Sequence, residues 1–290
     1  MKVLVIGGSG FLGSHIADEL TFRQNEVTIF DQSKSKWLQG NQRMVLGNIS
    51  DEDLLEKEIS KADVVYHMAG IADIGEATDS PLQTIKENII SSSIIMSLCA
   101  THSTRFMYGS TVYVYSKHGS FYRASKQSVE TLIDVFHENK GLNFTILRYG
   151  SLYGPRSQPW NGVKKLVKEM IDNKKILFNG TGKEKREYIH VKDAAKMSVD
   201  LLDKSYLQKA VTLTGLQVLT QEELLEMIVE IMDEDVEVGF TGESVAYNHY
   251  NITPYQYTPK SSLKLVSNEY IDLGQGILEL VSEISSDKSE

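Results

Sequence analysis

The sequence predicts an α/β protein: a doubly wound parallel sheet with a smaller mixed lobe after it. Two observations lead to this fold class. Short apolar runs alternate with helical segments in the first half of the chain, and that alternation becomes looser from about residue 152. Strands that alternate with crossover helices pair in parallel, with helices on both faces of the sheet. At 290 residues, the chain is long enough for such a sheet and a second lobe.

Six apolar and β-branched runs predict the buried strands of a first domain over residues 1–155. They are KVLVIG, EVTIFD, RMVLGN, DVVYHMAG, RFMYGS and NFTILRYG. The segments between them predict helices over residues 11–24, 51–60, 82–104 and 122–140. The link between the second and third strands is shorter and has only weak helical character.

We expect residues 156–290 to form the smaller mixed lobe, partly interleaved with the first domain and lying against the carboxyl ends of its strands. GVKKLVKEMIDN and KDAAKMSVDLLDKS predict amphipathic helices, AVTLTG a strand, and TQEELLEMIVEIM a helix with an N-cap threonine. A glycine- and tyrosine-rich stretch follows, and a last helix is predicted near residues 274–285.

Composition excludes several classes of protein. Apolar residues make up 41% and charged residues 24% of the chain, which is not the composition of a disordered protein. The net charge of −9 argues against a nucleic-acid partner, because phosphate binding needs a concentrated basic surface. The single cysteine, Cys99, excludes an intramolecular disulfide and fits a reducing compartment. With no signal peptide or long apolar segment visible, we expect a cytoplasmic protein with no membrane partner.

The run VLVIGGSGFLG predicts a dinucleotide site directly after the first strand. Glycines 7, 10 and 13 allow a tight turn, close approach of the backbone to a pyrophosphate, and close packing of helix on strand. The helix N-terminus offers free N–H groups to the phosphates. Asp31 ends the second strand, where a carboxylate accepts hydrogen bonds from a ribose 2′-OH and repels a 2′-phosphate. This pattern favours NAD over NADP in a Rossmann-type site.

Two further strand ends are expected to contact the cofactor. Asn48 and Ile49 follow the third strand and are positioned to meet an adenine. Met68, Ala69 and Gly70 follow the fourth strand, where a cofactor can lie against the backbone. We interpret the neighbouring His67 as a buried structural imidazole. The remaining histidines show no metal-ligand spacing, so no metal site is predicted.

Tyr122 and Lys126 are candidate catalytic residues, one helical turn apart on the same face. A tyrosine hydroxyl has a pKa of about 10 and is a poor base alone. A nearby ammonium and an oxidised nicotinamide stabilise the phenolate, so that it can take a proton from a substrate hydroxyl while the carbon is oxidised. Thr111 or Ser110, at the end of the fifth strand, would hold the same oxygen. Two solvated helix residues are the alternative, but ligands bind at this edge of parallel sheets.

Taken together, these motifs resemble the extended short-chain dehydrogenase/reductase family, in its group of nucleotide-sugar epimerases and dehydratases. They are GGSGFLG, Asp31, HMAG, Asn88, GSTVYVYS, YRASK, LRYGSLYGPR and REYIHVKDAA, with a weaker YTPKSSLKLV…LGQGILELV ending. The resemblance implies an NAD site that includes Gly7, Gly10, Phe11, Leu12, Asp31, Asn48, Ile49, Met68, Ala69, Gly70, Asn88, Ser110, Tyr122, Lys126 and Tyr149. It implies catalysis by Thr111, Tyr122 and Lys126, and a nucleotide diphosphate sugar at Ser110, Ser151, Arg156 and Arg186.

The sequence departs from the family pattern after the serine–threonine pair. Val112 and Tyr113 stand where 4,6-dehydratases carry the Asp-Glu pair that eliminates water, and sugar decarboxylases usually have a glutamate in this strip. The segment between Thr111 and Tyr122 is also shorter than is usual, although its ten intervening residues still allow Tyr122 to reach the site.

These departures favour a nucleotide-sugar 4-epimerase that works through a transient 4-keto sugar. Net oxidation or reduction at C4 by the same residues is the second hypothesis, and a non-catalytic dinucleotide sensor is the third. A homodimer formed through helices 82–104 and 122–140 is also expected, as in many family members. The apolar run IIMSLCA in the first of these helices fits either a dimer contact or the core.

Overall fold

The computed structural model describes residues 1–233, 235–242, 263–266 and 269–287. Most of the glycine- and tyrosine-rich stretch, at 243–262, lies outside the described residues, as do the first six residues of YTPKSSLKLV. The strands are β1 (Lys2–Ile6), β2 (Glu26–Asp31), β3 (Arg43–Leu46), β4 (Val64–His67), β5 (Arg105–Thr111), β6 (Phe144–Tyr149), β7 (Ser151–Tyr153), β8 (Lys175–Phe178), β9 (Lys185–His190), β10 (Lys209–Leu213), β11 (Val218–Thr220), β12 (Glu237–Phe240) and β13 (Leu263–Lys264).

The α-helices are α1 (Phe11–Phe22), α2 (Glu52–Ile59), α3 (Ile74–Asp79), α4 (Pro81–Thr84), α5 (Ser91–Thr101), α6 (Ser120–Lys140), α7 (Gly162–Asn173), α8 (Val191–Asp200), α9 (Gln221–Met232) and α10 (Leu273–Asp287). A π-helix spans Ile85–Ile90, and 3₁₀-helices span Val112–Tyr115 and Lys204–Tyr206.

The main sheet has the strand order β13-β10-β6-β5-β4-β1-β2-β3, and every pair is parallel. All six strands expected in the first domain are present, so the predicted doubly wound fold is confirmed. Because β2 and β4 flank β1 on opposite sides, the chain order reverses at the carboxyl end of β1. In open α/β sheets, ligands bind at such a reversal.

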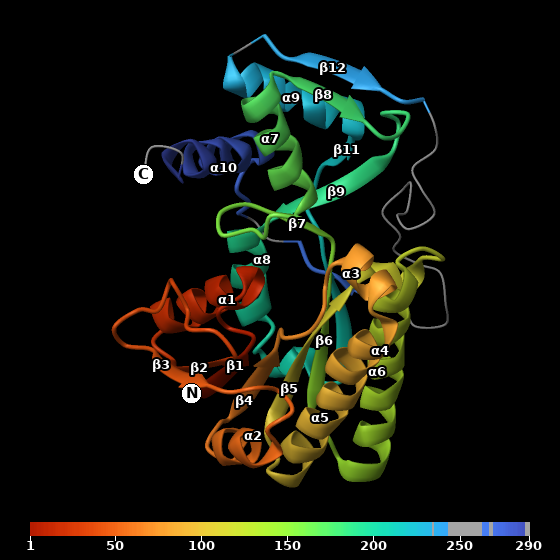
Figure 1. Cartoon of the computed structure of the whole chain (residues 1–290). Coiled ribbons are helices and arrows are strands. Elements are labelled where there is room, and N and C mark those ends of the chain that lie inside the picture. The colour runs from red at the N-terminus through yellow and green to blue at the C-terminus, as the bar shows by residue number, and fades with distance from the viewer. Residues whose placement is uncertain (234, 243–262, 267–268, 288–290) are drawn as a thin grey trace.

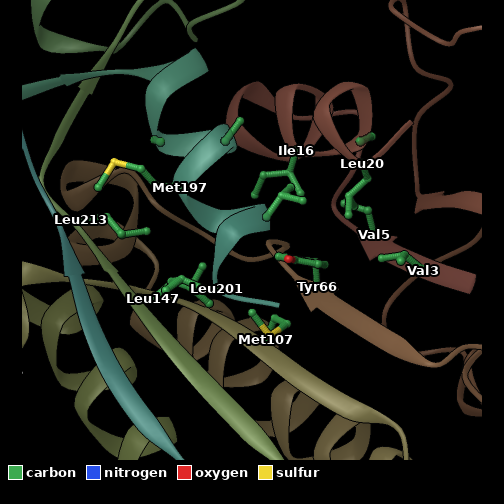
Figure 2. Packing of buried hydrophobic residues seen from close by; sticks show 14 of the residues in the cluster. Val3, Val5, Ile16, Leu20, Tyr66, Met107, Leu147, Met197, Leu201 and Leu213 are labelled. Carbon is green, nitrogen blue, oxygen red and sulfur yellow. The ribbon is translucent and has the colours of Figure 1, made fainter. Parts of the chain in front are cut away.

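Both faces of the sheet are covered, which explains why β1 is apolar at consecutive positions. Val3 and Val5 point to one face and pack with α1 and α8, as Figure 2 shows. Leu4 and Ile6 point to the other face and pack with α2, α5 and α6. Side chains alternate along a strand, so a strand buried on both sides needs apolar residues without interruption.

The second lobe is built on a separate core of α7, α9 and α10, with β12 at the top of the lobe in Figure 1 and paired with β8. A three-stranded sheet in the order β11-β9-β7 lies between this core and the main sheet. Thr220 begins α9 with the predicted cap, reinforced by a reciprocal bond with Glu223. The lobes are interleaved: β10 pairs with β6 over five positions, and α8 packs on α1.

Three of the helical segments differ from the sequence expectation. The helix expected over 82–104 consists of α4, the π-helix and α5, and ends at Thr101. The helix expected from KDAAKMSVDLLDKS ends at Asp200 and is followed by a 3₁₀ turn. Helix α3 was not expected, because its six residues, IGEATD, are too few to show a helical period. In IIMSLCA, the side chains of Ile95, Met96, Leu98 and Cys99 are buried, so these residues belong to the core.

Candidate active site

A cavity of about 980 Å³ lies between the two lobes. Its floor is formed by the carboxyl ends of the main-sheet strands, and its opposite wall by α7, β8 and β9. Most of the residues that the sequence singles out line it: Gly7, Gly10, Phe11, Leu12, Asp31, Asn48, Ile49, Met68, Ala69, Gly70, Ser110, Thr111, Tyr122, Lys126, Tyr149, Ser151 and Arg186. Asn88 and Arg156 do not.

The glycine turn leaves no room for side chains. Gly7 has φ +85°, and a Cβ there would lie 2.5 Å from the backbone nitrogen of Ala69. A Cβ on Gly13 would lie 2.2 Å from the Gly7 carbonyl oxygen. These close approaches bring the start of α1 against the ends of β1 and β4. The turn therefore has the shape that places a phosphate next to backbone N–H groups.

Asp31 braces this turn from the end of β2. Its carboxylate accepts hydrogen bonds from the backbone nitrogens of Ser9 and Ser33, each at 3.0 Å. The side chain lines the cavity beside Gln32. Since Ser9 lies inside the glycine turn, the acid that would receive the ribose hydroxyl also fixes the position of the phosphate loop.

The Asn88 side chain lies behind the cavity wall and joins two segments by hydrogen bonds. Its Oδ1 accepts a hydrogen bond from the Ile71 backbone nitrogen at 2.8 Å, and its Nδ2 donates to the Ile71 carbonyl and to Ser125 Oγ, each at 2.9 Å. The side chain is 2% exposed and lies within the π-helix. It therefore joins the loop after β4 to α6 one residue before Lys126, and does not line the cavity itself.

Tyr122, Lys126, Ser110 and Thr111 all line the cavity. The Lys126 ammonium nitrogen lies 5.9 Å from the centroid of the Tyr122 ring and donates to the Gly109 carbonyl oxygen at 2.7 Å. Burial lowers the pKa of Lys126 to about 8, and the nearby Glu130 carboxylate opposes this shift. Part of the lysine population is therefore neutral slightly above physiological pH.

The short segment between Thr111 and Tyr122 folds into a compact turn. Gly119 has φ +100°, and a Cβ there would meet the Tyr113 ring at 2.7 Å. Gln127 Nε2 donates to the Val114 carbonyl at 2.8 Å, which ties the turn to α6. The Tyr113 ring packs edge-on against Tyr122, with centroids 6.2 Å apart. The turn brings Tyr122 to the cavity, as expected, and places the Tyr113 ring in its wall.

A buried charge cluster beneath these residues was not expected from the sequence. Glu130 pairs with Arg148 at 2.6 Å, and Ser110 Oγ donates to the same carboxylate at 2.6 Å. Arg148 also donates to the Tyr115 hydroxyl. The only sequence signal is that Glu130 follows Lys126 by four residues on an otherwise amphipathic helix.

The remaining predicted residues fall into two groups. Ser151 on β7 and Arg186 on β9 line the side of the cavity that belongs to the second lobe. Tyr149 also lines it, but its hydroxyl is hydrogen-bonded to Ser198 Oγ at 2.6 Å, and burial raises its pKa. The Arg156 guanidinium pairs with Asp18 at 2.8 Å and lies over the Trp37 ring, outside the cavity.

His67 is a core residue, as expected. Its side chain is 1% exposed, its Nε2 is hydrogen-bonded to Ser92 Oγ at 2.8 Å, and burial lowers its pKa to about 3. Within residues 1–233, 235–242, 263–266 and 269–287, no group of three or more His, Cys, Asp or Glu side chains could hold a metal ion. Over the same residues, no helix has both the length and the apolar character needed to cross a membrane.

Comparison with known families shows which family the chain belongs to. The family model for the NAD dependent epimerase/dehydratase family matches residues 3–211, which include most of β1, all of β2 to β9 and most of β10. The chain belongs to this family. Its members are enzymes that use NAD, and the cavity described above is where the family's cofactor site would lie.

Relatives within the family have different activities. The UDP-N-acetyl-alpha-D-glucosaminuronate decarboxylase of Bacillus cytotoxicus is 28% identical over 229 residues, 70% of this chain and 71% of that protein. A putative UDP-glucose 4-epimerase of Methanocaldococcus jannaschii is 27% identical over 265 residues, 84% of each chain. The structure of Thermotoga maritima UDP-glucose 4-epimerase with UDP-glucose has a TM-score of 0.86, with 23% identity, over 99% of this chain and 100% of that one.

The residues present fit NAD. Gly7, Gly10 and Gly13 line the cavity without side chains, so a pyrophosphate could approach the backbone of the turn. Asp31 would hold the adenosine ribose, and Lys126 would hold the nicotinamide ribose. NAD supplies reversible two-electron oxidation of a substrate alcohol when it is bound.

Proposed function

We propose that this chain is an NAD-dependent nucleotide-sugar 4-epimerase that works through a transient 4-keto sugar. The proposal rests on the residues that occupy the turn after Thr111. Val112 is 1% exposed and packs with Val114 and Tyr115, while Tyr113 lines the cavity. The two positions where the resemblance expects the acid–base pair of a dehydratase thus hold an apolar core residue and a phenol.

In this proposal Tyr122 removes the proton from the C4 hydroxyl and later returns it. Lys126 stabilises the phenolate form of Tyr122 through its positive charge. Thr111 holds the C4 oxygen as the carbon changes from alcohol to ketone and back. The sugar rotates between the two transfers, so the hydrogen returns to its opposite face and the configuration at C4 inverts.

The second lobe supplies the groups that suit a nucleotide diphosphate. Arg186 and Lys165 line the cavity wall opposite the glycine turn. An arginine there can bind a diphosphate through charge-assisted hydrogen bonds. Tyr188 and Phe178 lie in the same wall and offer aromatic surfaces to a base. Ser151 lies between this wall and the main sheet.

The proposal is tested by incubating the purified chain with UDP-glucose, UDP-N-acetylglucosamine or UDP-glucuronic acid and identifying products by NMR. A 4-epimerase yields the C4-inverted sugar with no net change in nicotinamide absorbance and no need for added NADH. A 4-keto-6-deoxy product would identify a dehydratase, and a pentose with released CO₂ a decarboxylase. Steady formation or consumption of NADH would favour the alternative, net oxidation or reduction at C4.

We also propose that the chain forms a homodimer in the cytoplasm through the α4–α5 and α6 region. Leu82, Ile90 and Val135 are large apolar side chains exposed on these helices, at 74%, 52% and 47%. Exposed apolar residues grouped on neighbouring helices suit a two-fold contact. Light scattering after size-exclusion chromatography gives the mass directly, and Leu82→Glu with Ile90→Glu should shift a dimer to monomer.

A further inference from the structure

The end of β5 carries two adjacent hydroxyl side chains, Ser110 and Thr111, and both line the cavity. They are 4% and 5% exposed, so each makes few contacts with solvent. A hydroxyl has one proton to donate and two lone pairs that accept. Which of the two can donate a hydrogen bond to a bound substrate therefore depends on where each proton is already held.

The Ser110 proton is held by Glu130. Ser110 Oγ lies 2.6 Å from Glu130 Oε1. The same carboxylate accepts from Arg148 at both oxygens, with Nε 3.0 Å from Oε1 and Nη2 2.6 Å from Oε2. The carboxylate of a salt bridge only accepts hydrogen bonds, so Ser110 is the donor.

Arg148 keeps this arrangement in place. Its side chain is 0% exposed, its Nη1 donates to the Tyr115 hydroxyl, and its guanidinium carbon lies 4.8 Å from the centroid of the Tyr115 ring. The cluster thereby joins β5, β6, α6 and the 3₁₀ turn. Because the pair is shielded from water, a Ser110 proton turned toward the cavity would leave Glu130 short of a donor in a buried position, which is unfavourable.

Thr111 is in the opposite situation. Its Oγ1 accepts a hydrogen bond from the Tyr113 backbone nitrogen at 3.3 Å. Among the described residues, none accepts its proton. The Thr111 hydroxyl can therefore donate into the cavity, which Tyr122 and Lys126 also line.

We propose that Glu130 and Arg148 form a positioning pair that separates the two hydroxyls by role. Ser110 meets the cavity only as a hydrogen-bond acceptor, and Thr111 is the donor that holds the reacting oxygen. The identity of that oxygen rests on the proposed function, whereas the direction of each hydrogen bond does not.

Neutron diffraction from crystals of the full chain, exchanged into D₂O without substrate, tests the hydrogen-bond directions without any reaction. We expect the Ser110 deuterium on the line to Glu130 Oε1 and the Thr111 deuterium directed into the cavity. A Ser110 deuterium that points into the cavity overturns the proposal. This result holds whether or not the chain is an epimerase.

Single substitutions test the roles in the reaction, followed as the reduction of bound NAD when nucleotide sugar is added. Thr111→Val should slow this step roughly 100-fold, the loss typical of a removed catalytic donor, and Thr111→Ser should recover most of the rate. Ser110→Ala removes only an acceptor and should cost less than about tenfold. Equal losses in Ser110→Ala and Thr111→Val contradict the proposal.

A double substitution gives a sharper result. In Glu130→Gln, the amide oxygen can still accept from Arg148 while the amide nitrogen donates to Ser110 Oγ, which frees the Ser110 proton for the cavity. We therefore expect Glu130→Gln with Thr111→Val to react at least about tenfold faster than Thr111→Val alone, a coupling of the kind that a double-mutant cycle detects. If Glu130 only supports the fold, the two losses add or the double variant is slower still.

Glu58→Gln is the matched control. Glu58 is also a buried carboxylate, 4% exposed, and is paired with Arg43 and, at 3.0 Å, with Lys61, but it lies on α2 outside the cavity. Glu58→Gln should lower the midpoint temperature of thermal unfolding. Combined with Thr111→Val, it should not increase the rate of NAD reduction. If Glu130→Gln does not fold, the neutron structure and the Ser110→Ala comparison still decide. If no nucleotide sugar reduces NAD in the unmodified chain, the proposed function fails and the neutron result alone decides.

Discussion

Lys126 lies against the ring of Tyr108, with its ammonium nitrogen 4.8 Å from the ring centroid. The same nitrogen donates to the Gly109 carbonyl, so two consecutive residues of β5 hold the cation. The aromatic face and the carbonyl oxygen stabilise a positive charge whose side chain is only 8% exposed. Burying a cation costs stability, which is expected where the charge serves a reaction.

Lys126→Met should therefore separate stability from activity. Removing a buried charge in favour of an apolar side chain should raise the free energy of unfolding by about 1–3 kcal/mol. The rate of NAD reduction by substrate should fall at least roughly 100-fold, because Tyr122 loses the charge that stabilises its phenolate. Urea unfolding and stopped-flow absorbance measure the two effects. A variant that is less stable than the unmodified chain would contradict the account of burial.

The same burial predicts a pH dependence. The pKa of Lys126 is lowered to about 8 in the folded chain, whereas an unfolded lysine has a pKa of about 10.4. Between these two pKa values the unfolded state binds more protons than the folded state. The free energy of unfolding contributed by Lys126 therefore rises with pH over this range. Below about pH 8, burial of Lys126 lowers the free energy of unfolding by its full amount. The advantage of Lys126→Met in urea unfolding should shrink as pH rises above 8. Activity that needs the ammonium should fall over the same range.

Tyr122→Phe should remove the acid–base group and little else. We expect a rate loss of at least about 100-fold with NAD affinity within about twofold of the unmodified value, since the ring and its contact with Tyr113 remain. Fluorescence titration of NAD and NMR detection of product measure both. Tyr206→Phe, at a tyrosine outside the cavity, is the control and should change neither quantity.

Asp31→Asn should weaken NAD binding by roughly 10- to 100-fold, the usual effect of losing a charged hydrogen-bond acceptor. The preference for NAD over NADP should fall as well, because the repulsion of a 2′-phosphate is lost. Calorimetric titration with each cofactor measures both changes. Asp51→Asn, which alters a carboxylate that caps α2 outside the cavity, should leave both affinities unchanged.

Gly13→Ala should disturb the phosphate turn through a single methyl group. The added Cβ would lie 2.2 Å from the Gly7 carbonyl oxygen, so α1 must shift away from β1. Overpacking of this kind costs about 1–3 kcal/mol of unfolding free energy, and NAD affinity should fall with it. Gly40→Ala is the comparison, because no heavy atom lies within 4 Å of its added Cβ. If the two variants behave alike, close packing is not the reason for the glycine.

The features that the sequence indicates are those that depend on local patterns of residues. The alternating strands, the glycine turn and the Tyr122–Lys126 spacing each depend on residues within one or two elements. Short strands such as β7 and β11 were missed because three residues carry no period. Their place is set by pairing with β9, which is a contact between distant segments.

Two of the expected site residues do not line the cavity, for a similar reason. Arg156 ends a motif that predicts a substrate contact, and in the structure its backbone has φ +65° and its guanidinium pairs with Asp18 on α1. Asn88 is predicted to contact the cofactor, and in the structure its amide is hydrogen-bonded to Ile71 and Ser125. The partner of Glu130 is Arg148 on another strand, and nothing in the local sequence indicates which buried charges will meet.

The chain returns to the main sheet after it has entered the second lobe. This limits how the protein can be divided into fragments. A fragment cut at residue 155 would keep the glycine turn and the Tyr122–Lys126 pair, but would lose β10, leaving β6 as a bare apolar edge. It would also lose α8, which shields one sheet face and α1. Such a fragment should aggregate instead of binding nucleotide, so the two halves are best expressed as one polypeptide.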